Sequence, residues 1–113
     1  MPNQQSDLDL MFHALSDRTR RGMVERLTRG PATVGELAQP LTMSLPSVLQ
    51  HLQLLEKSGL VTSQKAGRVR TCYVQPAALT AVEAWIKRHK AMWEGHLDRL
   101  ADYLDETKED DAP

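Results

Sequence analysis

The chain has 113 residues, of which 41% are hydrophobic and 26% charged, and its formal net charge is −1. These values predict one soluble domain with a modest core, which aliphatic side chains must fill because only 4% of the residues are aromatic. The N-terminus lacks the basic start and apolar run of a signal peptide, and the absence of about 18 consecutive apolar residues excludes a membrane span. The single cysteine, Cys72, cannot form an internal disulfide, so we expect a cytoplasmic protein.

The small net charge hides an uneven distribution of charged residues. Residues 17–70 contain nine Lys and Arg against four Asp and Glu, whereas residues 98–113 contain two against seven. A basic segment is typical of proteins that bind a polyanion, so a near-neutral total does not exclude nucleic acid as the partner. The alternative, that both segments are simply solvated surfaces, stays open on charge alone.

Capping signals predict two helices in the first 30 residues. Ser6 precedes an amphipathic run and is the expected N-cap of a short first helix. Ser16 is the expected N-cap of a second helix, which runs to Arg29 and which Gly30-Pro31 ends.

Two further helices with a tight connection follow. Thr33 and Glu36 form a capping box for a short third helix that stops at Pro40. Ser44 is the expected N-cap of a fourth helix, which Gly59 ends in the left-handed conformation. A helix pair of this kind is the sequence form of a helix-turn-helix.

After the fourth helix the pattern changes from helical to β. Leu60–Lys65 and Val69–Val74 are rich in β-branched residues and predict a hairpin with its turn at Ala66–Arg68. A long last helix is expected over Ala77–Asp105. The predicted fold class is therefore mainly α with a small β-hairpin, a winged helix-turn-helix in the order α-α-α-α-β-β-α. We expect residues 1–6 to be a flexible N-terminus and residues 106–113 to be a disordered acidic tail. Residues 7–105 are expected to form one DNA-binding and dimerisation domain.

The fourth helix has two different faces. Placed 100° apart, Val48, Leu52 and Leu55 fall on one side and are expected to face the core. The opposite side carries amides and small hydroxyls, which suit contact with adenine and with phosphates, and it is flanked by two leucines, Leu49 and Leu54, which suit thymine methyl groups. A plain surface helix is the alternative. The candidate DNA-binding residues of this helix are Ser44, Pro46, Ser47, Leu49, Gln50, Gln53 and Lys57.

The hairpin carries basic residues near its tip, at Lys65, Arg68 and Arg70. These side chains are expected to contact flanking phosphates, which would add affinity without sequence information. Protection of an exposed strand edge by charge is a second role for the same residues. Three arginines at the start of the second helix fit either phosphate contacts or intramolecular ion pairs: Arg18, Arg20 and Arg21.

The predicted elements contain three blocks in a fixed order: ALSDRTRRGMVERL, TVGELAQPLTMSLPSVLQHLQLLEKSGLV and KAGRVRTCYV. Together they resemble the arsenic-repressor (ArsR/SmtB) family of bacterial regulators, over residues 8–104. The resemblance implies a homodimer that pairs through its first and last helices and places two recognition helices in successive major grooves. Family members are usually repressors that cover a palindromic operator and release it when an inducer binds. This chain departs from many relatives at Leu49 and Gln50, where they carry Ser and then Lys or Arg, so its operator sequence cannot be taken from theirs. The inducer is likewise not given by the sequence.

The last helix has an apolar stripe longer than one small domain is expected to cover, which favours a homodimer. Packing of the whole stripe within one chain is the alternative. Two-fold symmetry places the half-sites about one helical turn apart. The expected dimer-interface residues are Leu8, Phe12, Ile86, His89, Trp93, Leu97, Leu100 and Leu104.

Metal sensing is not expected, because the third helix has no cysteine and the last helix lacks the Asp-x-His motif of zinc-binding relatives. His89 and His96 are seven residues apart, which is about 10 Å along a helix and too far for one ion within a monomer. Whether they bind a metal across a dimer stays open, and Cys72 is interpreted as structural. No catalytic motif is present, so we predict neither an enzyme nor a cofactor. A metal-responsive repressor and a winged helix that binds protein are the alternatives to a DNA-binding repressor.

Overall fold

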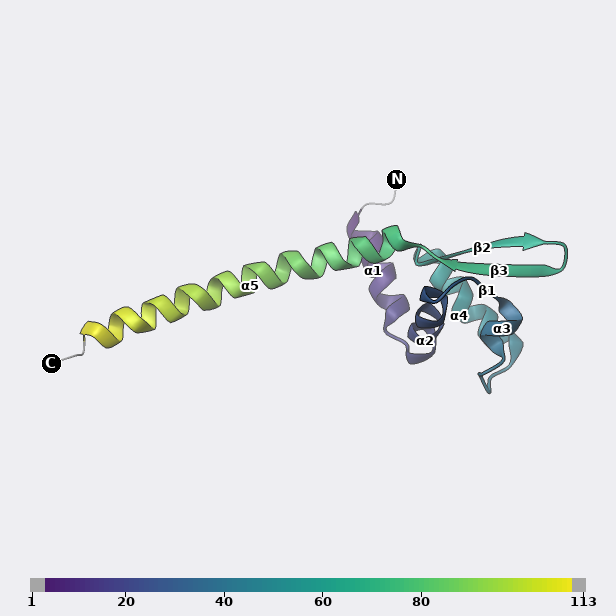
Figure 1. Ribbon diagram of the computed structural model, residues 1–113, viewed down its shortest axis with the longest axis horizontal. Helices are drawn as coiled ribbons and strands as arrows, with labels where there is room; N and C mark the ends of the chain where they lie inside the picture. Colours follow the sequence, from purple (N-terminus) through teal and green to yellow (C-terminus); the bar gives the residue numbers. More distant parts are fainter. Residues whose placement is uncertain (1–3, 111–113) are drawn as a thin grey trace. The chain divides into compact units, whose positions relative to one another are not determined.

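The computed structural model describes the backbone of residues 4–110 and the side chains of residues 7–107. The chain divides into two compact units, residues 1–82 and 83–113. Its elements are shown in Figure 1. In chain order they are α1 (Gln4–Leu15), α2 (Arg18–Thr28), β1 (Ala32–Thr33), α3 (Val34–Ala38), α4 (Leu45–Lys57), β2 (Val61–Ala66), β3 (Val69–Val74) and α5 (Pro76–Asp110).

Most helix boundaries lie where the capping signals predicted them. Thr33 and Glu36 form the predicted capping box, in which the Thr33 hydroxyl accepts from the Glu36 backbone N–H at 3.1 Å. Ser44 is the N-cap of α4, and its hydroxyl accepts from the Ser47 backbone N–H at 3.4 Å. Gly59, with φ of 84°, follows α4 in the left-handed conformation.

The predicted N-cap of α2 is wrong by one residue. Asp17, and not Ser16, has the extended cap conformation, and its carboxylate accepts from the Arg20 backbone N–H at 3.0 Å. The Ser16 hydroxyl instead donates to the carbonyl of His13 at 2.6 Å. Ser16 therefore provides a hydrogen-bond donor at the C-terminal end of α1. A serine hydroxyl can either cap a helix N-terminus or donate to a nearby carbonyl, so the residue type does not distinguish the two roles.

The sheet has a strand that the sequence did not reveal. The strand order is β1-β3-β2 and both pairs are antiparallel, so β3 is the central strand. Strand β1 has two residues and is too short to produce a periodic pattern. The hairpin loop is also one residue shorter than predicted, because Ala66 pairs with Val69 and leaves only Gly67 and Arg68 in the turn. Gly67 has φ of 63°, as a tight two-residue hairpin turn requires.

The first and last helices are longer than predicted. Helix α1 already includes Gln4, although residues 1–6 were expected to be flexible, and α5 continues to Asp110, although residues 106–113 were expected to be disordered. No Gly or Pro interrupts residues 105–110, and Glu and Lys there favour a helix. Residues 1–3 and 111–113 lie outside the described residues.

The core of the first unit is formed by aliphatic side chains from α1, α2, α4 and the sheet. Helix α4 contributes Val48, Leu52 and Leu55, which are at most 3% exposed and confirm the predicted buried face. The sheet contributes Cys72 from the central strand, 1% exposed. Other buried core residues are Leu8, Met11, Ala14, Met23, Val24, Leu27, Leu37, Leu60 and Val61.

A buried arginine connects three helices of this unit. Arg20 is 7% exposed, and its Nε donates to the carbonyl of Ala14 at 2.8 Å. Its Nη2 donates to the carbonyl of His13 at 3.2 Å, and its Nη1 donates to Nδ1 of His51, on α4, at 3.1 Å. Arg21 donates similarly to the carbonyl of Leu15 at 2.8 Å. The two arginines thus satisfy carbonyls at the C-terminal end of α1, which have no partner within the helix.

We predict that Arg20→Met lowers the free energy of unfolding by roughly 1–3 kcal/mol, since it leaves the buried Ala14 carbonyl without its donor while keeping the apolar part of the side chain. Urea denaturation at a fixed protein concentration measures the change. The exposed Arg88 of α5 provides the control, and Arg88→Met should stay within about 0.5 kcal/mol of the wild type. Equal effects of the two substitutions would contradict the assigned role.

Candidate nucleic-acid interface

The polar face of α4 is exposed to solvent. Gln50, Gln53 and Lys57 are all exposed on the side opposite the buried aliphatic residues, as is Pro46 in the first turn. Leu49, beside these residues, is 40% exposed and adds apolar surface to this face. At the N-terminus of the helix, the hydroxyls of Ser44 and Ser47 lie 3.0 Å apart and form a hydrogen bond.

We call the β2–β3 hairpin, residues 61–74, the wing. Two adjoining cavities lie between the exposed face of α4 and the wing. The larger, of about 730 Å³, is lined by Leu49, by the N-terminus of α3 and by Lys65, Arg68 and Arg70 of the wing. The smaller, of about 280 Å³, is lined by Leu49, Arg70 and Gln53 among others. The structure therefore brings five of the ten predicted DNA-binding residues together in one groove. The other five do not line it: Ser44, Pro46, Ser47, Gln50 and Lys57.

Glu56 connects the wing to α4, and nothing in the sequence pointed to it. One of its carboxylate oxygens accepts a hydrogen bond from the hydroxyl of Ser63 on β2. The other lies 3.9 Å from Nη2 of Arg70 on β3. The Glu56 side chain is 26% exposed and the Arg70 side chain 49%, so solvent screens this ion pair. The Glu56 carboxylate therefore offsets part, and not all, of the positive charge of Arg70.

Lys65 and Arg68, near the tip of the wing, are fully available to a ligand. Both are exposed, and the structure gives neither side chain a hydrogen bond or an ion pair with another described residue. The groove therefore has a positive charge that Glu56 does not balance. This electrostatic character suits phosphate groups.

Two titratable groups of the first unit have shifted pKa values. The hydrogen bond from the Arg20 backbone N–H, followed by the positive charge of Arg20, lowers the pKa of Asp17. Asp17 is thus ionised at neutral pH, the form that accepts hydrogen bonds at a helix N-terminus. Burial raises the pKa of the Cys72 thiol, which disfavours the reactive thiolate and agrees with a structural cysteine.

The histidines of α5 are engaged with neighbouring residues of the same helix. His89 stacks on Trp85 with ring centroids 4.1 Å apart, and its Nδ1 lies 2.8 Å from the Trp85 carbonyl. Arg99 donates to Nδ1 of His96 at 2.9 Å. Within the part of the chain that the structure describes, no three His, Cys, Asp or Glu side chains come close enough to bind one metal ion. None of the described helices is both long and apolar enough to span a membrane.

Comparison with known proteins agrees with this geometry. A family model described as a helix-turn-helix domain matches residues 15–64. The chain is 39% identical over 102 residues to the HTH-type transcriptional regulator Rv2034 of Mycobacterium tuberculosis, a match that covers 90% of this chain and 92% of that protein. The crystal structure of an ArsR-family transcriptional regulator superposes with a TM-score of 0.78 at 48% identity and covers 83% of this chain and 97% of that one. The chain belongs to the ArsR family.

Membership in the ArsR family makes the chain a transcriptional regulator with a helix-turn-helix DNA-binding domain, and not an enzyme. The arsenical resistance operon repressor of Escherichia coli is also similar, with 36% identity over 81 residues that cover 66% of this chain and 69% of that protein. The predicted winged helix-turn-helix fold is confirmed. The wing is the β2–β3 hairpin, and α3 and α4 are the helix pair.

We predict that Glu56→Ala loosens the wing. Amide exchange in β2 and β3 should become about tenfold faster, because a hydrogen bond to a charged group contributes roughly 1.5 kcal/mol. Hydrogen exchange measured by NMR reports each strand separately. Glu83→Ala serves as the control, since Glu83 forms an exposed ion pair with Lys87 at 3.2 Å and contacts no strand through it. Unchanged exchange in the wing of Glu56→Ala would show that the carboxylate does not stabilise it.

Proposed function

We propose that this protein is a homodimeric repressor that covers a palindromic operator. The observation that carries the proposal is the pairing of an exposed amide face on α4 with a basic wing that shares a groove with it. An amide side chain can bind the N6 and N7 atoms of adenine at once, and α4 offers two such groups, Gln50 and Gln53, on its exposed side. This arrangement supports sequence reading in the major groove.

The wing supplies the part of the binding free energy that does not depend on sequence. Lys65 and Arg68 reach solvent without an intramolecular partner, so their charge is available to phosphates beside the α4 contact. We assign Arg70 a smaller share, because Glu56 lies 3.9 Å from it. Ser44, Ser47 and Lys57 are further proposed contacts, at the two ends of α4.

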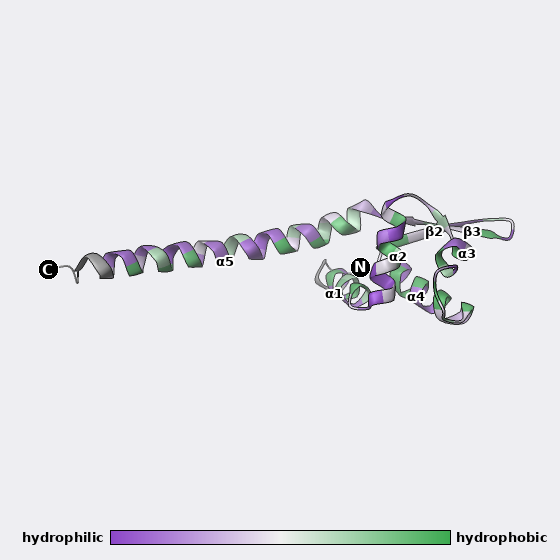
Figure 2. Ribbon diagram, turned by 60° about the horizontal axis from the view of Figure 1, so that its bottom comes forward, coloured by the Kyte–Doolittle hydropathy of each residue, from purple (hydrophilic) through white to green (hydrophobic). Residues whose placement is uncertain are grey.

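The second unit supports a homodimer through its apolar side chains. Ile86, Trp93, Leu97, Leu100 and Leu104 are 47–64% exposed, although residues of this kind are usually buried. Their spacing of seven, four, three and four residues places them on one side of α5. Figure 2 shows hydrophobic and hydrophilic positions alternating along α5. A second copy of the chain would remove this stripe from water.

The expected contribution of α1 to the dimer needs one correction. Leu8 is only 8% exposed and belongs to the core of its own chain, since it lies on the buried side of α1 with Met11. Phe12 is 37% exposed and keeps surface that a partner chain can contact. We therefore retain Phe12, and not Leu8, beside the α5 residues and His89 in the proposed interface.

The reading face is tested with Gln50→Ala and Gln53→Ala together. We predict at least a tenfold loss of affinity for the operator and little change for a random duplex, since each bidentate amide contact contributes roughly 1–3 kcal/mol of discrimination. The operator is first located by footprinting on the promoter of the protein's own gene, and affinities are then measured by fluorescence anisotropy.

Two further variants complete this experiment. Gln75→Ala is the matched control, because the Gln75 amide donates to Thr62 at the base of the wing and does not lie on α4. Arg68→Ser should instead weaken both duplexes and reduce the salt dependence by about one counterion. An equal loss on both duplexes for the Gln50 and Gln53 variant would remove the amides from the reading face.

The dimer is tested by placing charge in the apolar stripe. We predict that the wild type sediments as a dimer and that Trp93→Glu with Leu97→Glu sediments at the monomer mass of 12.7 kDa, because a buried unpaired charge opposes association. Ala91→Glu adds one such charge on the other side of α5 and should leave the dimer intact. Sedimentation velocity measures all three, and a monomeric wild type would overturn the proposal.

A further inference from the structure

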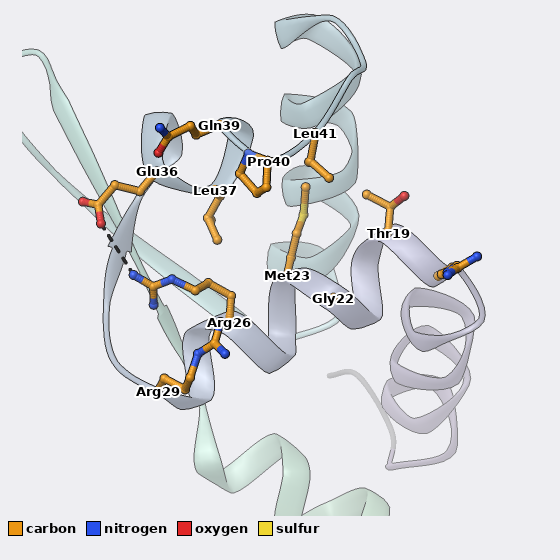
Figure 3. Close-up of a pocket in the computed structure, with 11 residues that line it drawn as sticks. Thr19, Gly22, Met23, Arg26, Arg29, Glu36, Leu37, Gln39, Pro40 and Leu41 are labelled. Atoms are coloured by element: carbon orange, nitrogen blue, oxygen red, sulfur yellow. Dashed lines mark ion pairs between the residues drawn. The ribbon is translucent and has the colours of Figure 1, made fainter.

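A separate depression lies between α2 and the turn that follows α3. It has a volume of about 760 Å³ and shares no lining residue with the groove between α4 and the wing. This volume falls in the range of about 300–1,000 Å³ that small-molecule sites occupy. Figure 3 shows side chains of α2 on one side of the depression and those of α3 and the turn on the other. Its inner surface is apolar, and three arginines surround it.

The apolar surface is formed by side chains that the core already fixes in place. Met23 and Leu37 are each 3% exposed and line the depression from α2 and α3. Pro40 and Leu41 extend this surface along the turn. A ligand placed here would therefore meet a rigid apolar wall, against which a hydrocarbon group gains roughly 25 cal/mol for each Å² removed from water.

The charges around the depression are unbalanced. Arg18, Arg26 and Arg29 line it, against one acidic residue, Glu36. Arg26 is already occupied, since its Nη2 lies 3.5 Å from Glu36 Oε2 and its Nη1 donates to the Gly30 carbonyl at 3.2 Å. The guanidinium groups of Arg18 and Arg29 have no hydrogen bond or ion pair with any described side chain or carbonyl. Two positive groups are thus available beside an apolar wall.

Gly22 keeps the depression open. It lies in the middle of α2 and lines the depression, and a Cβ built on it would meet no atom within 4 Å. A glycine inside a helix destabilises it by roughly 1 kcal/mol relative to alanine, so the residue is unfavourable for the helix itself. A larger side chain at position 22 would therefore extend into the depression.

We propose that this depression binds a small organic anion with an apolar body. Its oxyanion, a carboxylate or a phosphate ester, pairs with Arg18 or Arg29, because a guanidinium matches both groups with two parallel hydrogen bonds. Its hydrocarbon part packs on Met23 and Leu37. The proposal does not depend on the operator or on the homodimer, since all residues of the site belong to the first unit of one chain.

The experiment titrates the full-length, ¹⁵N-labelled protein with sodium hexanoate and, separately, with hexyl phosphate. We expect saturable amide shifts confined to residues 18–29 and 36–41, with one site per chain. 1-Hexanol, which has no charge, and acetate, which has no apolar body, should each bind at least tenfold more weakly than the hexyl anions. The tighter of the two anions identifies the oxyanion that the site prefers.

Two variants locate the site. Arg18→Gln with Arg29→Gln should weaken binding of the hexyl anion at least tenfold, whereas Arg88→Gln, on α5, should leave it unchanged. Gly22→Leu should fill the depression and abolish binding while its thermal unfolding midpoint stays at or above the wild-type value, because leucine favours a helix more than glycine does.

Three results would overturn the proposal. Equal affinity for hexanol and hexanoate would remove the arginines from the site. Full binding by a folded Gly22→Leu variant would place the ligand elsewhere. Absence of saturable binding by either anion, combined with weaker duplex binding of the Arg18 and Arg29 variant, would assign these arginines to DNA phosphates.

Discussion

The burial of one side of α4 determines what its other side presents. Val48, Leu52 and Leu55 are at most 3% exposed, and each contributes roughly 2 kcal/mol of hydrophobic stabilisation that a rotation of the helix would lose. Since successive residues turn by 100°, this constraint directs Gln50 and Gln53 toward solvent. The exposed amides therefore have a defined orientation although no intramolecular bond holds them.

The same helix also determines where the wing lies. Glu56 contacts Ser63 on β2 and Arg70 on β3, so the carboxylate connects the end of α4 to both strands of the hairpin. The central strand β3 pairs with β1, which directly precedes α3. Helix α4 and the wing are thus stabilised together. The groove between them results from the contacts of Glu56 with both strands and from the pairing of β3 with β1.

Basic residues of the first unit serve different purposes. Arg20 and Arg21 stabilise the end of α1 through its carbonyls, and Arg26 pairs with Glu36. Lys65 and Arg68 keep their charge available beside α4, and Arg18 and Arg29 keep theirs beside the apolar depression. A count of charges along the chain indicates a polyanion-binding protein correctly, but it does not separate these groups, because partner choice depends on the surroundings of each guanidinium.

Much of the fold followed from the sequence, because its signals are local. The capping box at Thr33, the N-cap at Ser44 and the glycine at Gly59 each act within a few residues, and the buried face of α4 follows from helical spacing alone. Other features depended on contacts between distant residues: the strand β1, the internal role of Arg20, the Glu56 contact with the wing and the depression at Gly22. The sequence by itself determined the helices, the hairpin and the exposed amide face of α4, since backbone hydrogen bonds and side-chain periodicity are short-range. Only the tertiary structure decided which charges are neutralised and which face a cavity, because those outcomes depend on residues that folding alone brings together.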